Sequence, residues 1–407
     1  MSYHEVREAS PAAAAERAIP AGVWVLGFVS LLMDLSSEMI HALLPVYLVT
    51  VLGASFFEVG WIEGIAEATA SVTKVFSGAI SDWLGRRKLL AVLGYGLAAV
   101  TKPVFPLAPS LDWIVAARFL DRVGKGIRGA PRDALVASIA PPHLRGASIG
   151  LRQTLDTVGA FLGPFVAIVL MWLTGDHFRL VFWVAAAPAL LAVALLGFGV
   201  RERETNVRPA RFPLHAGELR QLGAPFWTIA GISAVFTLAR FSEAFLILRA
   251  EAAGLPIALA PAVLVVMNIV YAAVAYPVGA LSDRIGRTRL LGLGFAVLIV
   301  ADLVLGLGSR LWAIGLGVGL WGLHMGLTQG LLATLVADAA PEARRGTAYG
   351  LFNLLGGIAM LLASALAGFL WDRVGPQATF LSGAVFAFAA LLLLFGGYRG
   401  KLASMRY

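Results

Sequence analysis

The chain has 407 residues, of which 59% are hydrophobic and 14% charged, and its mean hydropathy is +0.82. This composition excludes an ordinary soluble domain, and recurring apolar windows long enough to cross a bilayer predict an all-α membrane protein with many spans. The alternating segments of roughly ten residues that are typical of a transmembrane β-barrel are absent. There are no cysteines, which excludes disulfides and thiolate metal sites.

The apolar segments divide the chain into two similar halves. Residues 1–21 carry charges of both signs without an apolar core, so they predict a cytoplasmic lead rather than a signal peptide. The expected spans are 22–51, 57–83, 88–107, 111–139, 146–173, 178–199, 225–250, 258–285, 288–308, 311–339, 345–371 and 375–397. These predict six-helix bundles over 22–199 and 225–397, a polar linker containing prolines at 200–224, and a cytoplasmic tail at 398–407.

Lysines and arginines are distributed unevenly between the two sides of these spans. Most lie on the side of the linker, whereas the opposite loops hold only Arg179, Arg310 and Arg373. The positive-inside rule therefore predicts a multi-pass protein of the cytoplasmic (inner) membrane with both termini in the cytoplasm. The net charge of +8 then reflects topology rather than a surface for nucleic acid.

A short phrase occurs twice. Residues 78–88 read GAISDWLGRRK, and residues 279–289 read GALSDRIGRTR. Two further pairs keep nearly the same offset: PPHLRGASIG (141–150) with PEARRGTAYG (341–350), and Ser37-Glu38 with Ser242-Glu243. Self-similarity at half the chain length predicts two pseudo-symmetric six-helix bundles.

These phrases resemble the signature of the major facilitator superfamily (MFS) in the loop between helices 2 and 3, and its counterpart between helices 8 and 9. The resemblance covers residues 22–397 and implies a twelve-helix fold, alternating access and a cytoplasmic gate. Trp83 departs from the basic residue usual in the signature, a position that Arg284 keeps in the second copy. The gate residues expected at the cytoplasmic end are Gly78, Asp82, Gly85, Arg86, Arg87, Asp121, Arg122, Gly279, Asp283, Gly286 and Arg287.

Two further motifs match the family in part. In the fourth span Arg118 matches a buried arginine that the resemblance links to proton coupling, although Arg122 replaces a usual glycine. In the fifth span Gly159, Gly163 and Pro164 match part of the signature of antiporting, drug-efflux branches. The resemblance therefore favours export.

Ionisable side chains within the spans are costly in hydrocarbon unless they are paired or face water. Asp34, Glu38 and His41 share one helical stripe, which indicates either a cavity wall or a set of hydrogen bonds between helices. Glu63 and Glu67 are one turn apart. Two such carboxylates favour one being protonated near neutral pH, unless they pair with Lys74 or a neighbouring arginine.

The remaining polar positions extend this set. Arg152 and Asp156 are spaced for an ion pair or for substrate contact. Arg240 and Glu243 are expected on one face of the seventh span. No spacing of these residues specifies a metal site. The proton-coupling candidates are Asp34, Glu38, Glu63, Glu67 and Arg118. The substrate-cavity candidates are His41, Arg152, Asp156, Arg240, Glu243, Asn268, His324, Gln329 and Asn353.

No G-x-x-x-x-G-K-[ST] loop occurs, so direct drive by ATP is not expected. We expect a monomeric secondary transporter without a cofactor. It would export a small charged or zwitterionic solute by alternating access, and transport would be coupled to protons. Membrane lipid would surround it, and no nucleic acid partner is expected. The alternatives are a proton symporter or uniporter that imports a nutrient or metal chelate, a permease-like sensor without transport, and a membrane enzyme. No Ser/His/Asp constellation supports the enzyme.

Overall fold

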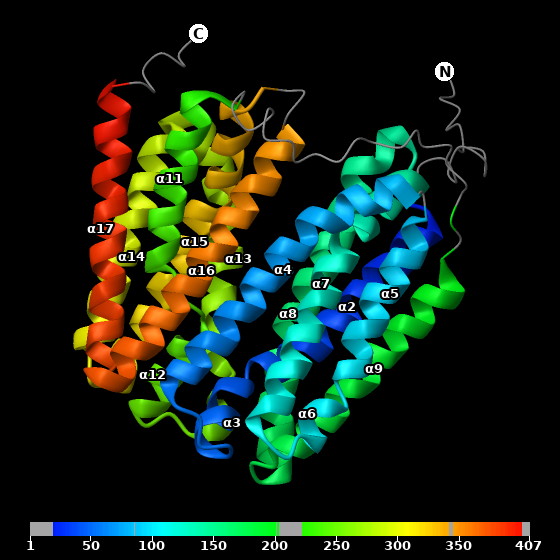
Figure 1. Cartoon of the computed structure of the whole chain (residues 1–407), viewed down its shortest axis with the longest axis horizontal. Helices are drawn as coiled ribbons and strands as arrows, with labels where there is room; N and C mark the ends of the chain where they lie inside the picture. The colour runs from blue at the N-terminus through cyan, green and yellow to red at the C-terminus, as the bar shows by residue number, and fades with distance from the viewer. Residues whose placement is uncertain (1–18, 85, 201, 203–221, 342–344, 401–407) are drawn as a thin grey trace, which may run out of the picture.

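The computed structural model describes residues 19–84, 86–200, 202, 222–341 and 345–400, and all regular secondary structure in these ranges is helical. The helices form two groups (Figure 1). The first contains α2 (Ala21–His41), α3 (Leu44–Thr50), α4 (Phe56–Leu84), α5 (Arg87–Thr101), α6 (Val104–Leu107), α7 (Leu111–Ile139), α8 (Arg145–Thr174) and α9 (Phe178–Gly199). The second contains α11 (Gly223–Ala239), α12 (Ala244–Ala252), α13 (Ala262–Ile285), α14 (Arg287–Leu307), α15 (Leu311–Ala339), α16 (Arg345–Arg373) and α17 (Pro376–Gly400).

Within the described residues, ten helices or pairs of consecutive helices are long and apolar enough to cross a bilayer. The predicted second and fourth spans correspond to α4 and α7, which have 29 residues each. Both are long enough to span, but their charged and polar side chains make them too hydrophilic to qualify by hydropathy. With these two included, the prediction of an all-α protein with twelve spans is confirmed.

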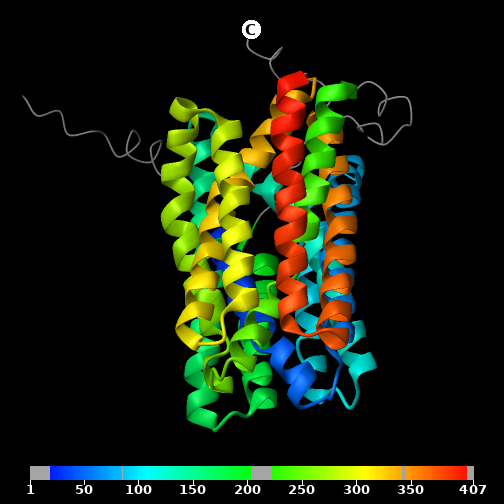
Figure 2. The same ribbon diagram turned by 90° about the vertical axis from the view of Figure 1, so that its left-hand side faces the viewer.

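The outer surface of the molecule suits a lipid environment. Large apolar side chains point outward from many helices, such as Phe198, which is 93% exposed, and Leu190, which is 54% exposed. The helices of both groups run lengthwise in Figure 2, and the two groups lean apart in Figure 1. An apolar surface of this extent would not stay dispersed in water, and parallel helices satisfy their backbone hydrogen bonds within hydrocarbon.

Three predicted spans are interrupted rather than continuous. The first breaks between α2 and α3, the third between α5 and α6, and the seventh between α11 and α12, over residues 240–243. Pro45 and Pro103 lie at the first two breaks, where proline ends a helix by removing a backbone donor. Irregular backbone at this depth is tolerated where it is buried or lines a cavity.

The two groups meet closely at the end of the molecule that holds α3 and α12 (Figure 1). A Cβ atom added to Gly60 of α4 would lie 2.2 Å from the carbonyl oxygen of Ser364 in α16. The Asp372 carboxylate of α16 accepts hydrogen bonds from the backbone N–H groups of Phe56 and Phe57, at 3.1 Å and 2.8 Å. One group of helices thus caps the first turn of α4 in the other.

Replacing Gly60 with alanine is expected to loosen this contact, because the new methyl group would overlap a backbone oxygen that cannot give way cheaply. The chain has no cysteines, so a single Phe56→Cys substitution reports accessibility there. The Gly60→Ala change should raise labelling of that cysteine by a maleimide about fivefold or more. Gly315→Ala is the control, because its Cβ would meet nothing within 4 Å; equal labelling rates in the two variants would contradict the expectation.

Candidate functional site

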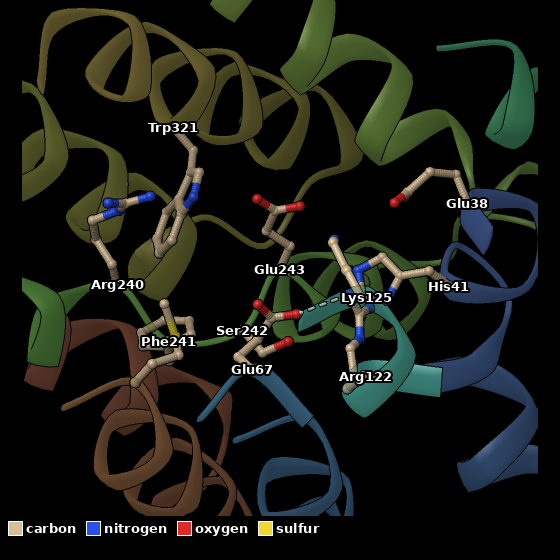
Figure 3. A pocket seen from close by; sticks show the side chains of 11 residues that line it. Glu38, His41, Glu67, Arg122, Lys125, Arg240, Phe241, Ser242, Glu243 and Trp321 are labelled. Carbon is tan, nitrogen blue, oxygen red and sulfur yellow. Dashed lines mark ion pairs between the residues drawn. The ribbon is translucent and has the colours of Figure 1, made fainter. Parts of the chain in front are cut away.

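A cavity of about 260 Å³ lies between the two groups of helices (Figure 3). Both groups contribute charged side chains of both signs to its wall. It is lined by Glu38, His41, Glu67, Arg122, Lys125, Arg240, Phe241, Ser242, Glu243, Trp321 and Met360. A polar cavity at the interface of two repeats is where carriers bind their solutes.

The first group contributes the stripe that the sequence predicted on α2. Glu38 and His41 both line the cavity. Close packing of α8 against α2 holds Glu38 in place, since a Cβ atom on Gly163 would lie 2.6 Å from the Cβ atom of Glu38. The glycines of the fifth span therefore allow close helix packing at this position.

The second group contributes the break between α11 and α12. Arg240 and Glu243 were expected to share a face of one continuous helix, and that expectation is wrong because α11 ends at Ala239 and α12 begins at Ala244. The non-helical segment nevertheless brings Arg240, Ser242 and Glu243 to the cavity wall.

Arg118 is at the centre of a buried cluster behind the cavity. Its Nη2 atom lies 2.8 Å from Oε2 of Glu63 and 2.6 Å from Nδ1 of His41. A guanidinium can only donate hydrogen bonds, so Nδ1 of His41 accepts, and the proton of the neutral ring is then on Nε2. Glu63 therefore pairs with an arginine rather than sharing a proton with Glu67.

Glu67 is also paired, with Nη1 of Arg122 at 3.4 Å. Asp121 accepts from Nζ of Lys102 at 2.8 Å, and Lys102 also donates to Oγ of Ser37 at 3.0 Å. Asp121 and Arg122 were expected at the cytoplasmic end, and the structure corrects their position. Arg122 lies on the wall of the central cavity, and Asp121 joins α7 to a buried lysine at the α5–α6 break.

Four charged side chains of the cavity have no partner of opposite charge. Within the described residues, no oppositely charged group lies within 4.0 Å of Glu38, Glu243, Lys125 or Arg240, and their side chains form no hydrogen bond. Their carboxylates and cations stand around one space (Figure 3). Since unpaired charge in a sheltered site is unfavourable, two acids and two bases in this state favour a ligand that carries charge.

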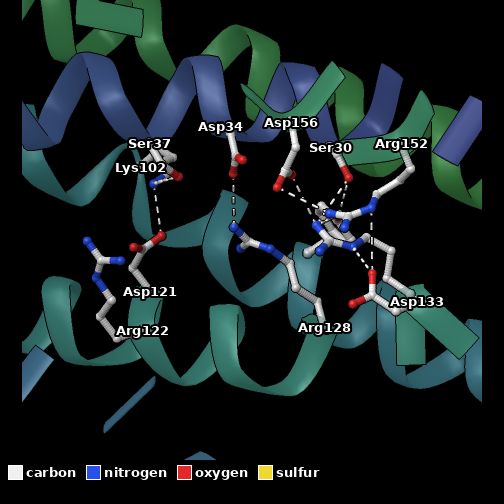
Figure 4. Close-up of polar contacts among 12 residues, drawn as sticks. Ser30, Asp34, Ser37, Lys102, Asp121, Arg122, Arg128, Asp133, Arg152 and Asp156 are labelled. Atoms are coloured by element: carbon white, nitrogen blue, oxygen red, sulfur yellow. Dashed lines mark hydrogen bonds and ion pairs between the residues drawn. The ribbon is translucent and has the colours of Figure 1, made fainter. Parts of the chain in front are cut away.

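A second polar region continues from this cavity along α7 (Figure 4). Asp34 lies 3.8 Å from Nη2 of Arg128. Asp156 lies 3.3 Å from Nη1 of Arg132 and 3.2 Å from Nη1 of Arg152, so the predicted pair between Arg152 and Asp156 is present. Asp34, Arg128, Arg132 and Asp156 line a pocket of about 220 Å³, which shares Lys125 with the central cavity.

The other cavity candidates are more scattered. Asn353 lines the second pocket, and Asn268 lines a third pocket between α8 and α13. His324 is fully buried, lies next to Trp321 and Phe236, and does not line the central cavity. Its neighbour Thr328 donates its hydroxyl to the His324 carbonyl, and Gln329 is half-buried on the same helix.

The predicted gate phrases are described only in part. Gly85 lies outside the described residues, and so do the surroundings of Gly78 and Gly279 and the side chains of Asp82 and Asp283. Gly286 has a φ of +95° at the turn before α14, which favours glycine, and Arg287 pairs with Asp338. Glu202 accepts from the backbone N–H of Arg87, and Arg86 precedes α5 as an exposed residue.

Sequence reasoning missed Lys102 and Lys125 as candidate site residues. The signal for Lys102 was available, because a lysine within the expected third span needs a partner. In the described part of the chain, no group of three or more His, Asp or Glu side chains is placed to hold a metal ion.

Comparisons with known proteins identify the family of the chain. The family model for the Major Facilitator Superfamily matches residues 26–363 and 244–403. An uncharacterized MFS-type transporter of Methanocaldococcus jannaschii is 35% identical over 93% of this chain and 96% of its own length. The multidrug resistance protein MdtH of Photorhabdus laumondii is 31% identical over 42% of each chain.

A solved structure of a transporter shares the fold. A solved structure of a POT family transporter in complex with a thioalcohol-conjugated peptide has a TM-score of 0.79 at 14% identity, covering 95% of this chain and 97% of that one. The chain belongs to the major facilitator superfamily. It is therefore a multi-pass membrane transporter of a solute, and not an enzyme.

Proposed function

We propose that the protein is a secondary active transporter for a small charged or zwitterionic solute, which binds in the central cavity. The observation that carries this proposal is the set of four unpaired charges, Glu38 and Glu243 with Lys125 and Arg240, around one space between the two groups of helices. A solute with both signs of charge would give each of them a partner. The two bundles, 22–199 and 225–397, would rock about this site as a single chain in the inner membrane, with both termini cytoplasmic.

Proton coupling is part of the proposal, through Asp34, Glu38, Glu63 or Glu67 with Arg118. Glu38 is the best supported, because it loses no ion pair when it takes up a proton. Glu63 and Glu67 would have to leave Arg118 and Arg122 first. Export is favoured by the glycines of the fifth span and by similarity over 42% of the chain to a multidrug resistance protein.

A panel of zwitterionic, singly charged and neutral solutes, screened by thermal stabilisation of the purified protein, should yield ligands among the charged members. Transport of such a ligand in proteoliposomes should then rise when a pH gradient is imposed, and Glu38→Gln should abolish that response. Assays in inverted and right-side-out vesicles determine the direction. A transport rate that does not change with the pH gradient, and that stays normal in Glu38→Gln and Glu67→Gln, would contradict proton coupling.

A further inference from the structure

A third space, of about 480 Å³, lies between α8 and α13. Its wall is mostly apolar and includes Phe161, Leu162 and Ile269. Asp34 and Asp156 form its polar inner end. A volume of this size is typical of pockets that hold small-molecule ligands.

This chamber is on the loosely packed side of the interface between the two groups. On the opposite side, glycines bring α4 and α16 into backbone contact, with Gly60 against Ser364 and Gly368 against Phe56. Among the described glycines of α8, none approaches α13 in this way. Of the lining residues, Val158 is 38% exposed and Ile269 is 52% exposed. The chamber therefore opens on the outer surface, which faces hydrocarbon in a bilayer.

The inner end of the chamber meets the second pocket, because Asp34 and Asp156 line both spaces. The far wall of that pocket carries Lys74, Lys125, Arg128 and Arg132. Arg128 and Arg132 are held by Asp34 and Asp156, at 3.8 Å and 3.3 Å. No carboxylate lies within 4.0 Å of Lys74 or Lys125 in the described part of the chain. Positive charge is thus in excess by two lysines.

We propose that these two joined spaces bind a single-chain amphiphile with a phosphate head group, which enters sideways from the bilayer. The head lies against Lys74 and Lys125, and the hydrocarbon chain lies along Phe161, Leu162 and Ile269. The proposal goes beyond the proposed function: the central cavity takes its own solute, and Lys125 is the residue that the two sites share among those lining them. Lysine is a strong partner for phosphate oxygens, and each buried methylene adds to affinity.

The test is the affinity of butyl, hexyl and octyl phosphate for the protein in lipid nanodiscs, measured by thermal stabilisation. Affinity should rise up to about fourfold for each added methylene. Ala272→Trp, which fills the chamber from α13, should flatten this rise and leave the affinity for butyl phosphate unchanged. The matched control is Ala187→Trp on the exposed face of α9. In this control, affinity should still rise with chain length, including any part of the rise that is caused by partition into lipid.

Further variants separate head from chain. Lys125→Ala should lower the affinity for all three phosphates by the same factor, and Ile269→Ala should reduce the rise without the bulk of a tryptophan. If affinity rises with chain length in both Ala272→Trp and Ile269→Ala as it does in the wild type, the chamber does not bind the hydrocarbon chain and the proposal is wrong. Tighter binding of octyltrimethylammonium than of octyl phosphate would also contradict the proposal. If the three alkyl phosphates bind through Lys125 with the same affinity at every chain length, this proposal fails and the proposed function stands. If no charged solute binds and cavity variants change nothing, the proposed function fails as well.

Discussion

Replacement of Arg118 by leucine should destabilise the protein by about 3–5 kcal/mol, because it leaves the carboxylate of Glu63 buried without a cation. Glu63 is fully buried, and Arg118 is its closest cation, at 2.8 Å. The same change removes the donor to Nδ1 of His41. Because His41 lines the central cavity, transport should be lost together with stability.

The measurement is unfolding of the purified variants in one detergent. Arg310→Leu is the matched control, because Arg310 is exposed before α15 and its loss should change stability by no more than about 0.5 kcal/mol. The double variant Arg118→Leu with Glu63→Met should recover part of the lost stability, since no unpaired charge then remains. A single Arg118→Leu variant that unfolds like Arg310→Leu would show that the buried pair is not a structural element.

The fold was largely predictable from the sequence because its signals are local. Apolar windows, the repeated phrase and the uneven lysines and arginines predicted twelve spans, and the observed helices begin and end within a few residues of the predicted bounds. The interruption at residues 240–243 was not predicted, since LARFSEAF contains no proline or glycine to end a helix. Only the packed structure shows that backbone there lines a cavity.

The candidate site was predictable in part. Helical periodicity placed Glu38 and His41 on one stripe, and both line the cavity. Periodicity along one helix cannot show which neighbouring helix supplies a partner. The pairs of Glu63 with Arg118, Glu67 with Arg122 and Asp121 with Lys102 therefore had to come from the structure.

Loss of the unpaired cavity charges should weaken solute binding strongly. A hydrogen bond to a charged group contributes about 1.5–3 kcal/mol, so Glu38→Gln and Arg240→Ala should each lower the affinity for a charged ligand about tenfold or more. The two residues stand in different groups of helices, on α2 and at the α11–α12 break. Their effects should combine to about a hundredfold or more in the double variant.

Equilibrium binding of a ligand from the solute panel to this double variant tests the central claim most directly. The matched control carries Glu58→Gln and Arg310→Ala, which remove the same charges at exposed positions away from the cavity. The account predicts wild-type affinity in the control and a loss of about a hundredfold or more in the Glu38→Gln, Arg240→Ala protein. A double variant that folds normally and binds the ligand as tightly as the control would contradict it.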